Sequence, residues 1–252
     1  MELSGKCAVV IGGTSGIGKA LALGLAEAGA DVVASSRSKE ACAAIAAEIE
    51  AVGRRSLTQT SDVQDRTSLE RLRDVVLEHF GKVDVLVNCA GRTQRVPTLD
   101  CPEELWNSIL DTNLTGTLRG CQIFGRGMIE RGHGRIINIA SLSTFVAFQE
   151  VAPYGCSKAA VGALTQSLAV EWARHGVLVN AIAPGIFPTA LNTALLDSPR
   201  GQELKLRTPM ARFGAASELV STAIHLASDR TSFTTGQILV VDGGFLASGV
   251  NQ

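Results

Sequence analysis

The fold is decided by the stretch Cys7-Ala8-Val9-Val10-Ile11-Gly12-Gly13-Thr14-Ser15-Gly16-Ile17-Gly18. Its first five residues are an apolar run, which predicts a buried strand. Glycines follow at the spacing G-x-x-x-G-x-G, and a helical pattern begins among them. A chain that leaves a strand and enters a helix beside a pyrophosphate needs unhindered backbone, and the helix N-terminus then faces the anion. Residues 12–18 therefore predict a phosphate-binding turn, although any tight strand–helix turn also favours glycine.

Short β-rich runs alternate with helical stretches along the rest of the chain. Helical patterns cover residues 17–28, 39–52 and 68–80, and a last helix is predicted at 217–228. Near-continuous apolar strands are typical of a parallel sheet that helices cover on both faces. The predicted strands are residues 7–11, 31–35, 56–60, 83–88, 135–140, 177–183 and 237–241. We therefore predict that residues 1–252 form a single α/β domain, a Rossmann-type doubly wound fold with a seven-stranded parallel sheet.

Composition narrows the class of protein. The chain is 46% hydrophobic and 19% charged with a net charge of −1, so it has material for a core and no basic excess for nucleic acid. No apolar run approaches the roughly 18 residues that span a membrane. The six cysteines and four histidines are scattered, so we expect no metal site. These features favour a soluble cytoplasmic protein that acts on small molecules.

The end of the second predicted strand bears on cofactor choice. A site specific for NAD usually places a carboxylate there to accept a hydrogen bond from the ribose 2′-hydroxyl. Ser36 stands at that position, and Arg37 follows it. Because a guanidinium group suits a 2′-phosphate, the pair predicts NADP as the cofactor.

Tyr154 and Lys158 are four residues apart near the start of a long helical pattern, so they share one helix face. A tyrosine has an ordinary pKa near 10, and a nearby ammonium group favours the phenolate. Tyr154 is the chain's only tyrosine, and Ser141 ends a predicted strand thirteen residues before it. Sites form at that edge of a parallel sheet, so these three residues predict acid–base chemistry.

Together these motifs resemble the short-chain dehydrogenase/reductase family over nearly the whole chain. The matching residues are Gly12, Gly16, Gly18, the run Asn88-Cys89-Ala90-Gly91, Asn113, Ser141, Tyr154, Lys158, Pro184-Gly185 and Val241-Asp242-Gly243-Gly244. The chain departs from the family pattern at Ile11, usually threonine, and at Cys89, usually asparagine. Both changes remove local hydrogen bonds and leave the predicted reaction path intact.

The resemblance implies a role for each matching residue. Tyr154 exchanges a proton with the substrate oxygen, while Lys158 binds the nicotinamide ribose and lowers the tyrosine pKa. Ser141 holds the reacting oxygen, and Asn113 holds a water in the proton relay. The implied cofactor contacts are Gly12, Thr14, Ser15, Gly16, Ile17, Gly18, Ser36, Arg37, Asp62, Val63, Asn88, Ala90, Gly91, Tyr154, Lys158, Pro184, Gly185, Ile186 and Thr189.

Within the family, residues 180–187 and 207–214 and the tail after Val241 look most like the gluconate 5-dehydrogenase, or sugar-acid, branch. Arg95 matches an arginine frequent in that branch and would suit a substrate carboxylate, although a solvent-facing loop charge is the alternative. Residues 189–212 are irregular and are interpreted either as a substrate lid or as surface structure. The resemblance also implies a homotetramer or homodimer.

Two other functions stay open at this point. A 3-oxoacyl-[acyl-carrier-protein] reductase would need a basic patch beside its cleft for its acidic partner, and Arg126, Arg131 and Arg135 are clustered in sequence. A cofactor-binding regulator without turnover is disfavoured, because it has no need of Asn113, Ser141, Tyr154 and Lys158 together.

Overall fold

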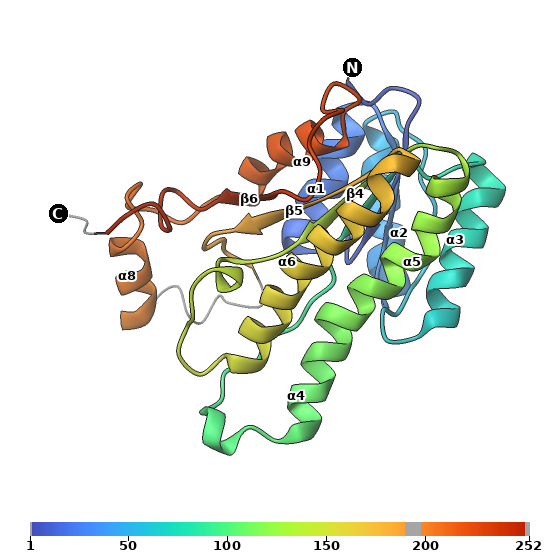
Figure 1. Cartoon of the computed structure of the whole chain (residues 1–252). Helices are drawn as coiled ribbons and strands as arrows, with labels where there is room; N and C mark the ends of the chain where they lie inside the picture. The colour runs from blue at the N-terminus through green and yellow to red at the C-terminus, as the bar shows by residue number, and fades with distance from the viewer. Residues whose placement is uncertain (1, 190–197, 250–252) are drawn as a thin grey trace.

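A parallel sheet lies between two layers of helices in the computed structural model, which describes residues 2–189 and 198–249 (Figure 1). The strands are β1 (Cys7–Ile11), β2 (Asp31–Ser35), β3 (Val85–Asn88), β4 (Gly134–Ile139), β5 (Val177–Pro184) and β6 (Ile238–Val241). They lie in the order β2-β1-β3-β4-β5-β6, and every neighbouring pair is parallel. This is the Rossmann-like single-domain α/β fold that the sequence predicts.

The strand predicted at residues 56–60 is wrong. The described part of the sheet has six strands, and this segment is irregular. It follows the edge of β2, where the Val32 amide donates to the Arg55 carbonyl at 3.1 Å. The Ser56 hydroxyl then donates to the Val32 carbonyl at 2.7 Å. Because a side chain occupies an acceptor that backbone pairing would use, no regular ladder forms here.

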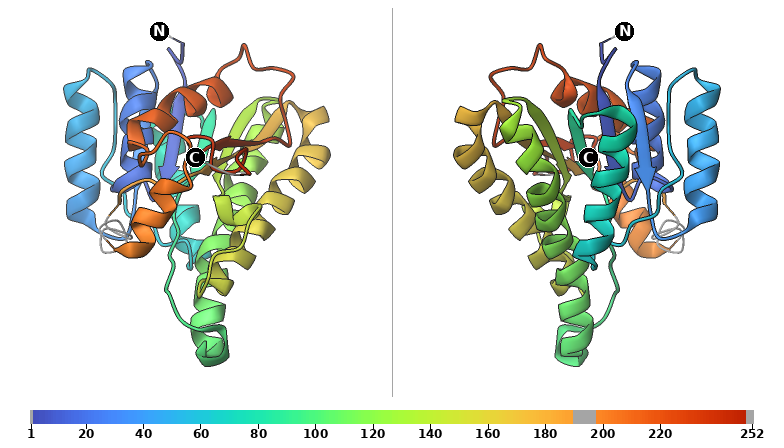
Figure 2. Two further views of the ribbon diagram at one scale, coloured as in Figure 1. Left: turned by 90° about the vertical axis from the view of Figure 1, so that its left-hand side faces the viewer. Right: turned by 90° about the vertical axis from the view of Figure 1, so that its right-hand side faces the viewer.

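Two layers of helices bury the faces of the sheet (Figure 2). One core lies under α1 (Gly16–Glu27), α2 (Lys39–Ala51) and α9 (Val220–Ala227), with Leu21 and Leu25 fully buried. The other lies under α3 (Arg66–Phe80), α5 (Gly116–Glu130) and α6 (Ala152–Trp172), with Leu69 and Met128 fully buried. Burial on both faces explains why the strands are apolar throughout rather than alternating. The described residues also form the helices α4 (Glu103–Leu110) and α8 (Pro199–Leu206), a π-helical turn at Asp111–Thr115 and short 3₁₀ turns at Thr98–Asp100, Leu142–Thr144, Ala173–His175 and Ala216–Leu219.

Local signals account for several helix boundaries. The Asp65 side chain accepts from the Thr67 amide and begins α3 two residues earlier than predicted, while Gly81 ends it in a left-handed conformation. The predicted helix at 217–228 is a 3₁₀ turn followed by the shorter α9. Across residues 2–189 and 198–249, no helix is long and apolar enough to cross a membrane.

The strand order creates a crevice at one edge of the sheet. After β2 the chain crosses to the other side of β1 and forms β3. The loops that follow β1 and β3 start at neighbouring strands and then lead away from each other. In open parallel sheets, ligands bind at such a switch point, outside the carboxyl ends of the strands. Every motif singled out in the sequence, except the arginines at 126–135, lies near this edge or on a loop that leads from it.

Candidate active site

The turn after β1 is shaped by glycines that approach other backbone closely. Gly12 has φ +79°, and a Cβ on it would lie 2.6 Å from the Ala90 amide nitrogen. A Cβ on Gly18 would lie 2.0 Å from the Gly12 carbonyl oxygen. Larger residues are therefore excluded at both positions. The turn delivers the chain into α1 at Gly16, so the α1 N-terminus opens beside the loop after β3. This cradle fits the pyrophosphate of a dinucleotide.

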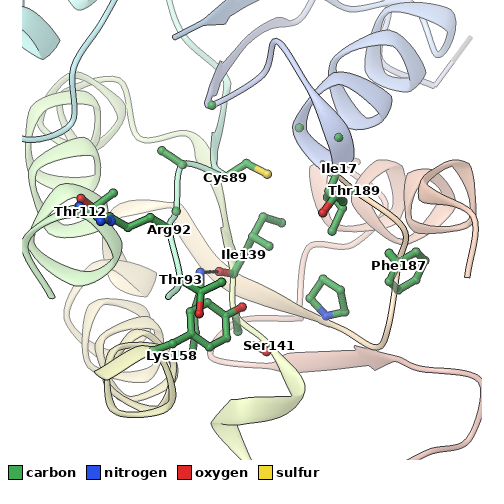
Figure 3. Close-up of a pocket in the computed structure, with 18 of the residues that line it drawn as sticks. Ile17, Cys89, Arg92, Thr93, Thr112, Ile139, Ser141, Lys158, Phe187 and Thr189 are labelled. Carbon is green, nitrogen blue, oxygen red and sulfur yellow. Dashed lines mark hydrogen bonds between the residues drawn. The ribbon is translucent and has the colours of Figure 1, made fainter. Parts of the chain in front are cut away.

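A cavity of about 600 Å³ extends from this turn along the sheet edge. Ile17 and Thr189 lie at the α1 side of it, and Ser141 and Lys158 at the opposite side (Figure 3). Most of the residues predicted from the sequence line it. They are Gly12, Thr14, Ser15, Gly16, Ile17, Gly18, Ser36, Arg37, Asp62, Val63, Ala90, Gly91, Ser141, Tyr154, Lys158, Pro184, Gly185, Ile186 and Thr189. Asn88, Arg95 and Asn113 are not among the lining residues.

The charge of the lining is strongly positive. Among the described residues that line it, four are cationic, Arg37, Arg92, Lys158 and Arg200, and one, Asp62, has a carboxylate. Arg37 is exposed just after β2, and Asp62 lies on the neighbouring loop, where its Oδ1 accepts from the Gln64 amide at 2.9 Å. A cavity with this lining favours anionic ligands.

Lys158 and Tyr154 lie one turn apart on α6, as predicted. The Lys158 Nζ donates to the Ile139 carbonyl at 2.6 Å and lies 5.8 Å from the centre of the Tyr154 ring. Burial lowers the pKa of Lys158 from 10.5 to about 8, an effect that Cys89 partly opposes. The ammonium is therefore mostly charged at neutral pH but is poised to lose its proton on the alkaline side.

Burial also raises the pKa of Tyr154, while a hydrogen bond with the Ser141 side chain lowers it. The spacing of Tyr154 and Lys158 in the sequence predicts instead that the Lys158 ammonium lowers the pKa of this phenol. In the protein without cofactor, desolvation of the phenolate outweighs the favourable contacts, so Tyr154 is protonated at neutral pH. A protonated tyrosine is the form that can donate to a carbonyl oxygen.

Asn113 lies in the π-helical turn Asp111–Thr115, between α4 and α5. Its Oδ1 accepts from the Arg92 amide at 2.8 Å, and its Nδ2 donates to the Arg92 carbonyl at 2.9 Å and to the Ser157 hydroxyl at 3.0 Å. The side chain is fully buried. Asn113 thus joins the loop after β3 to α6 beside Lys158. Turns of this rare kind often occur at functional sites.

Asn88 and Arg95 occupy positions outside the cavity. The Asn88 Nδ2 donates to the Asn138 Oδ1 at 2.9 Å within the sheet, which fixes the end of β3 against β4. Arg95 is about half exposed and forms an ion pair with Glu150 at 2.5 Å. Neither residue is among those that line the cavity, and their contacts with cofactor and substrate stay predictions.

Several lining residues were not foreseen from the sequence. They are Cys89, Thr93, Thr112, Leu142, Ser143, Phe148, Val151, Phe187, Arg200 and Leu204, among others. For Arg200 the sequence has one relevant signal, because Ser198-Pro199 is a typical helix start. In the structure the Ser198 side chain accepts from the Gly201 amide at 3.1 Å. That signal predicts a helix but not the cavity that it faces. In the ranges 2–189 and 198–249, no cluster of three potential metal ligands occurs.

A glycine-rich turn at a helix N-terminus and a Ser–Tyr–Lys group in one cavity define a nicotinamide-dependent oxidoreductase of the Rossmann type. A family model described as enoyl-(acyl carrier protein) reductase matches residues 12–246. The chain belongs to the short-chain dehydrogenase/reductase family.

Its relatives include several sugar-acid dehydrogenases. Gluconate 5-dehydrogenase of Gluconobacter oxydans (strain 621H) is 38% identical over 248 residues, which cover 98% of this chain and 97% of the relative. 2-Dehydro-3-deoxy-D-gluconate 5-dehydrogenase of Bacillus subtilis (strain 168) is 41% identical over 250 residues, with coverage of 98% and 96%. A solved structure of a gluconate 5-dehydrogenase from Burkholderia cenocepacia J2315, in complex with NADP and tartrate, has a TM-score of 0.94 at 38% identity, with coverage of 98% and 97%.

Proposed function

We propose that this protein is an NADP-dependent dehydrogenase that interconverts a secondary alcohol and a ketone in a sugar acid, such as gluconate and 5-ketogluconate. The observation that supports this most directly is the shared cavity of Ser141, Tyr154, Lys158 and Arg37. Its lining, as far as the structure describes it, has four cationic residues and one carboxylate. The named activities of the similar proteins support the substrate class.

When bound, the cofactor exchanges a hydride with the substrate carbon. The protein's own residues manage the proton. In the reductive direction Tyr154 donates its phenolic proton to the substrate oxygen, while the Ser141 hydroxyl holds that oxygen in place. Lys158 provides positive charge beside the ring and favours the phenolate that results. In the oxidative direction, the same phenolate accepts the proton of the alcohol.

The choice of NADP rests on the end of β2. A carboxylate at position 36 would repel a 2′-phosphate, and Ser36 has none. Arg37 lines the cavity, and no ion pair engages its guanidinium in the part of the chain that the structure describes. A bidentate arginine–phosphate contact is the natural use of such a group.

The acyl-carrier-protein alternative predicted a basic patch beside the cleft. Arg135 is the second residue of β4, at the edge of the sheet opposite the cavity, and is buried. Arg131 follows α5 near the same edge, and its guanidinium donates to the Val83 carbonyl at 2.5 Å. None of Arg126, Arg131 and Arg135 lines the cavity, so the cluster gives no support to docking of an acidic carrier protein there.

The test is a panel assay of the purified protein with NADP⁺ and NAD⁺ across sugar acids, polyols and simple secondary alcohols, with NADPH-dependent reduction of acetoacetyl thioesters alongside. We expect the highest kcat/KM with NADP⁺ and a sugar acid. Efficient thioester reduction without sugar-acid turnover would replace the proposed substrate with an acyl thioester.

Cofactor choice is tested separately by Ser36→Asp combined with Arg37→Leu. A new carboxylate repels the 2′-phosphate and accepts from a 2′-hydroxyl, so the NADP preference in kcat/KM should reverse. Glu40→Gln, which changes the charge of an exposed residue on α2 nearby, is the control and should leave the preference unchanged. Equal use of both cofactors by the unaltered protein would contradict the assignment of Arg37.

A further inference from the structure

Arg200 is the second residue of α8, and its position is fixed by the start of that helix. Pro199 occupies the first turn, and the Ser198 side chain caps the helix by accepting from the Gly201 amide at 3.1 Å. Arg200 and Leu204 lie one turn apart and both line the cavity. Helix α8 therefore presents one cationic and one apolar side chain to the site.

The guanidinium group of Arg200 is only partly satisfied. Its Nη2 donates to the Gln149 carbonyl at 3.1 Å. Its Nη1 is buried, and no acceptor from the described residues reaches it. Buried charged donors are normally hydrogen-bonded, so an ordered arginine with one open nitrogen at a cavity wall is suited to receive an acceptor from a ligand.

The partner of Arg200 locates it at the reacting end of the cavity. Gln149 lies between Phe148 and Val151, which both line the cavity, in the segment that joins Ser141 to Tyr154. The next residue, Glu150, has φ +64°, and its carbonyl accepts from the Val96 amide at 2.8 Å. The loops after β3 and β4 and helix α8 thus meet at residues 149–150, which holds the guanidinium in place beside the catalytic segment.

The other arginines near this end have partners. Arg92 donates from Nη1 to the Ser108 hydroxyl at 2.6 Å, and its backbone is held on both sides by Asn113. Arg95 pairs with Glu150 and does not line the cavity. Arg37 lies at the far end, just after β2. Among the arginines that line the cavity, Arg200 is the one with a buried guanidinium nitrogen that no described residue pairs.

We propose that Arg200 binds the carboxylate of the substrate and so determines the preference for sugar acids over uncharged polyols, a role that the sequence argument gave to Arg95. The bond from Nη2 to Gln149 holds the guanidinium at the cavity, so the anion is received by a group that is already ordered. This proposal rests on the proposed function, because it assigns the acid group of the proposed substrate to one residue.

The experiment compares D-gluconate with D-glucitol, which replaces the carboxylate with an uncharged alcohol. Arg200→Met keeps an unbranched aliphatic side chain and removes the charge. Arg200→Lys keeps the charge but lacks the paired donors of the guanidinium group. We expect Arg200→Met to raise KM for gluconate by about ten- to a hundredfold and to change KM for glucitol by less than about threefold. Arg200→Lys should recover part of the gluconate affinity.

Arg207→Ala is the matched control, because Arg207 follows the same helix, is exposed and pairs with Glu203 at 2.9 Å. It should leave both KM values unchanged. The Kd for NADP⁺, from quenching of intrinsic fluorescence, should also stay within about twofold in every variant. Titration calorimetry of gluconate into a Tyr154→Phe protein, with and without Arg200→Met, reads the same contact without turnover.

The outcomes separate the two proposals. If the unaltered protein turns over gluconate and Arg200→Met leaves its KM unchanged, or affects gluconate and glucitol equally, the role of Arg200 is overturned and the function stands. A large change in the Kd for NADP⁺ would overturn it too, because Arg200 would then bind the cofactor. If the unaltered protein neither binds nor oxidises any sugar acid, the proposed function fails and this inference fails with it.

Discussion

At the scale of single residues, the site depends on charges held in a poorly solvated place. Lys158 is almost fully buried and has a pKa of about 8 in the folded protein against 10.5 ordinarily, because burial disfavours its ammonium form. At about 1.4 kcal/mol per unit of pKa, that shift corresponds to about 3 kcal/mol of lost stability while the lysine stays charged. An unfavourable buried cation of this kind fits the catalytic role that we propose for Lys158.

Lys158→Met makes the stability cost of the buried ammonium measurable in the protein without cofactor. Below pH 8 both the folded and the unfolded chain bind the proton, and the whole penalty is present. Between pH 8 and 10.5 the Lys158 side chain keeps its proton only in the unfolded chain. The stability of the unaltered protein therefore rises with pH relative to that of the variant. We expect urea titrations to show that the free energy of unfolding of the unaltered protein, relative to that of the variant, rises by about 2–3 kcal/mol between pH 7 and pH 10. A difference that does not depend on pH would contradict the lowered pKa.

Tyr154 provides the second prediction at this scale. Since burial raises its pKa, the phenol is protonated at neutral pH, and alcohol oxidation, which requires the phenolate, should speed up as pH rises from 7 to 9. Tyr154→Phe should lower kcat by at least about a hundredfold in both directions and leave the Kd for the cofactor within a few fold. Retention of most activity by this variant would exclude the proposed proton transfer.

At the scale of secondary-structure elements, the π-helical turn Asp111–Thr115 turns Asn113 inward from the α4–α5 junction. Its amide makes three hydrogen bonds that tie the Arg92 backbone to Ser157 on α6. These bonds connect the loop after β3 with the helix that holds Tyr154 and Lys158. The water-holding role that the family resemblance implies for Asn113 stays a prediction, and the geometry adds a positioning role.

Asn113→Ala should remove all three bonds and leave the partly buried backbone amide and carbonyl of Arg92 without these partners. We expect a loss of about 1–3 kcal/mol in the free energy of unfolding, because these groups are only partly exposed to water. Asn107→Ala is the control, since Asn107 is exposed on α4, and should change stability by less than about 0.5 kcal/mol. Equal, small effects from both variants would show that the Asn113 contacts do not stabilise the fold.

At the scale of the whole molecule, α6 bears on assembly. One side of the helix packs on the sheet through residues such as Val161 and Leu168. The other side exposes Ala159, Ala163 and Val170, the last with 83% of its surface accessible. Apolar residues on both sides of a helix indicate that both sides are buried, one against the sheet of its own chain and the other against another subunit.

We therefore predict a homodimer or homotetramer that buries this face of α6. Light scattering at micromolar concentration should give a mass two or four times that of the 26.4 kDa chain. Val170→Asp would place a charge in the interface and should shift the mass towards that of one chain. A single-chain mass for the unaltered protein would refute the prediction.

Much of this protein could be predicted from local patterns in its sequence. The apolar strands, their alternation with helices and the glycines between β1 and α1 specify a parallel sheet with a cofactor cradle, because burial on two faces and a close backbone approach each restrict the residue types allowed. The spacing of Tyr154 and Lys158 is likewise local, since one helical turn brings them onto the same face. These features do not depend on which distant segments meet.

Only the tertiary structure decided which distant side chains share the cavity and what state their charges take. Residues 56–60 lost their strand because Ser56 bonds to Val32, and Arg95 turned to Glu150 while Arg200, more than a hundred residues later, came to line the cavity. The pKa of Tyr154 rose because burial outweighed its favourable contacts. Such outcomes follow from competition among partners and from desolvation, which depend on packing between segments far apart in the chain and leave no periodic signal in the sequence.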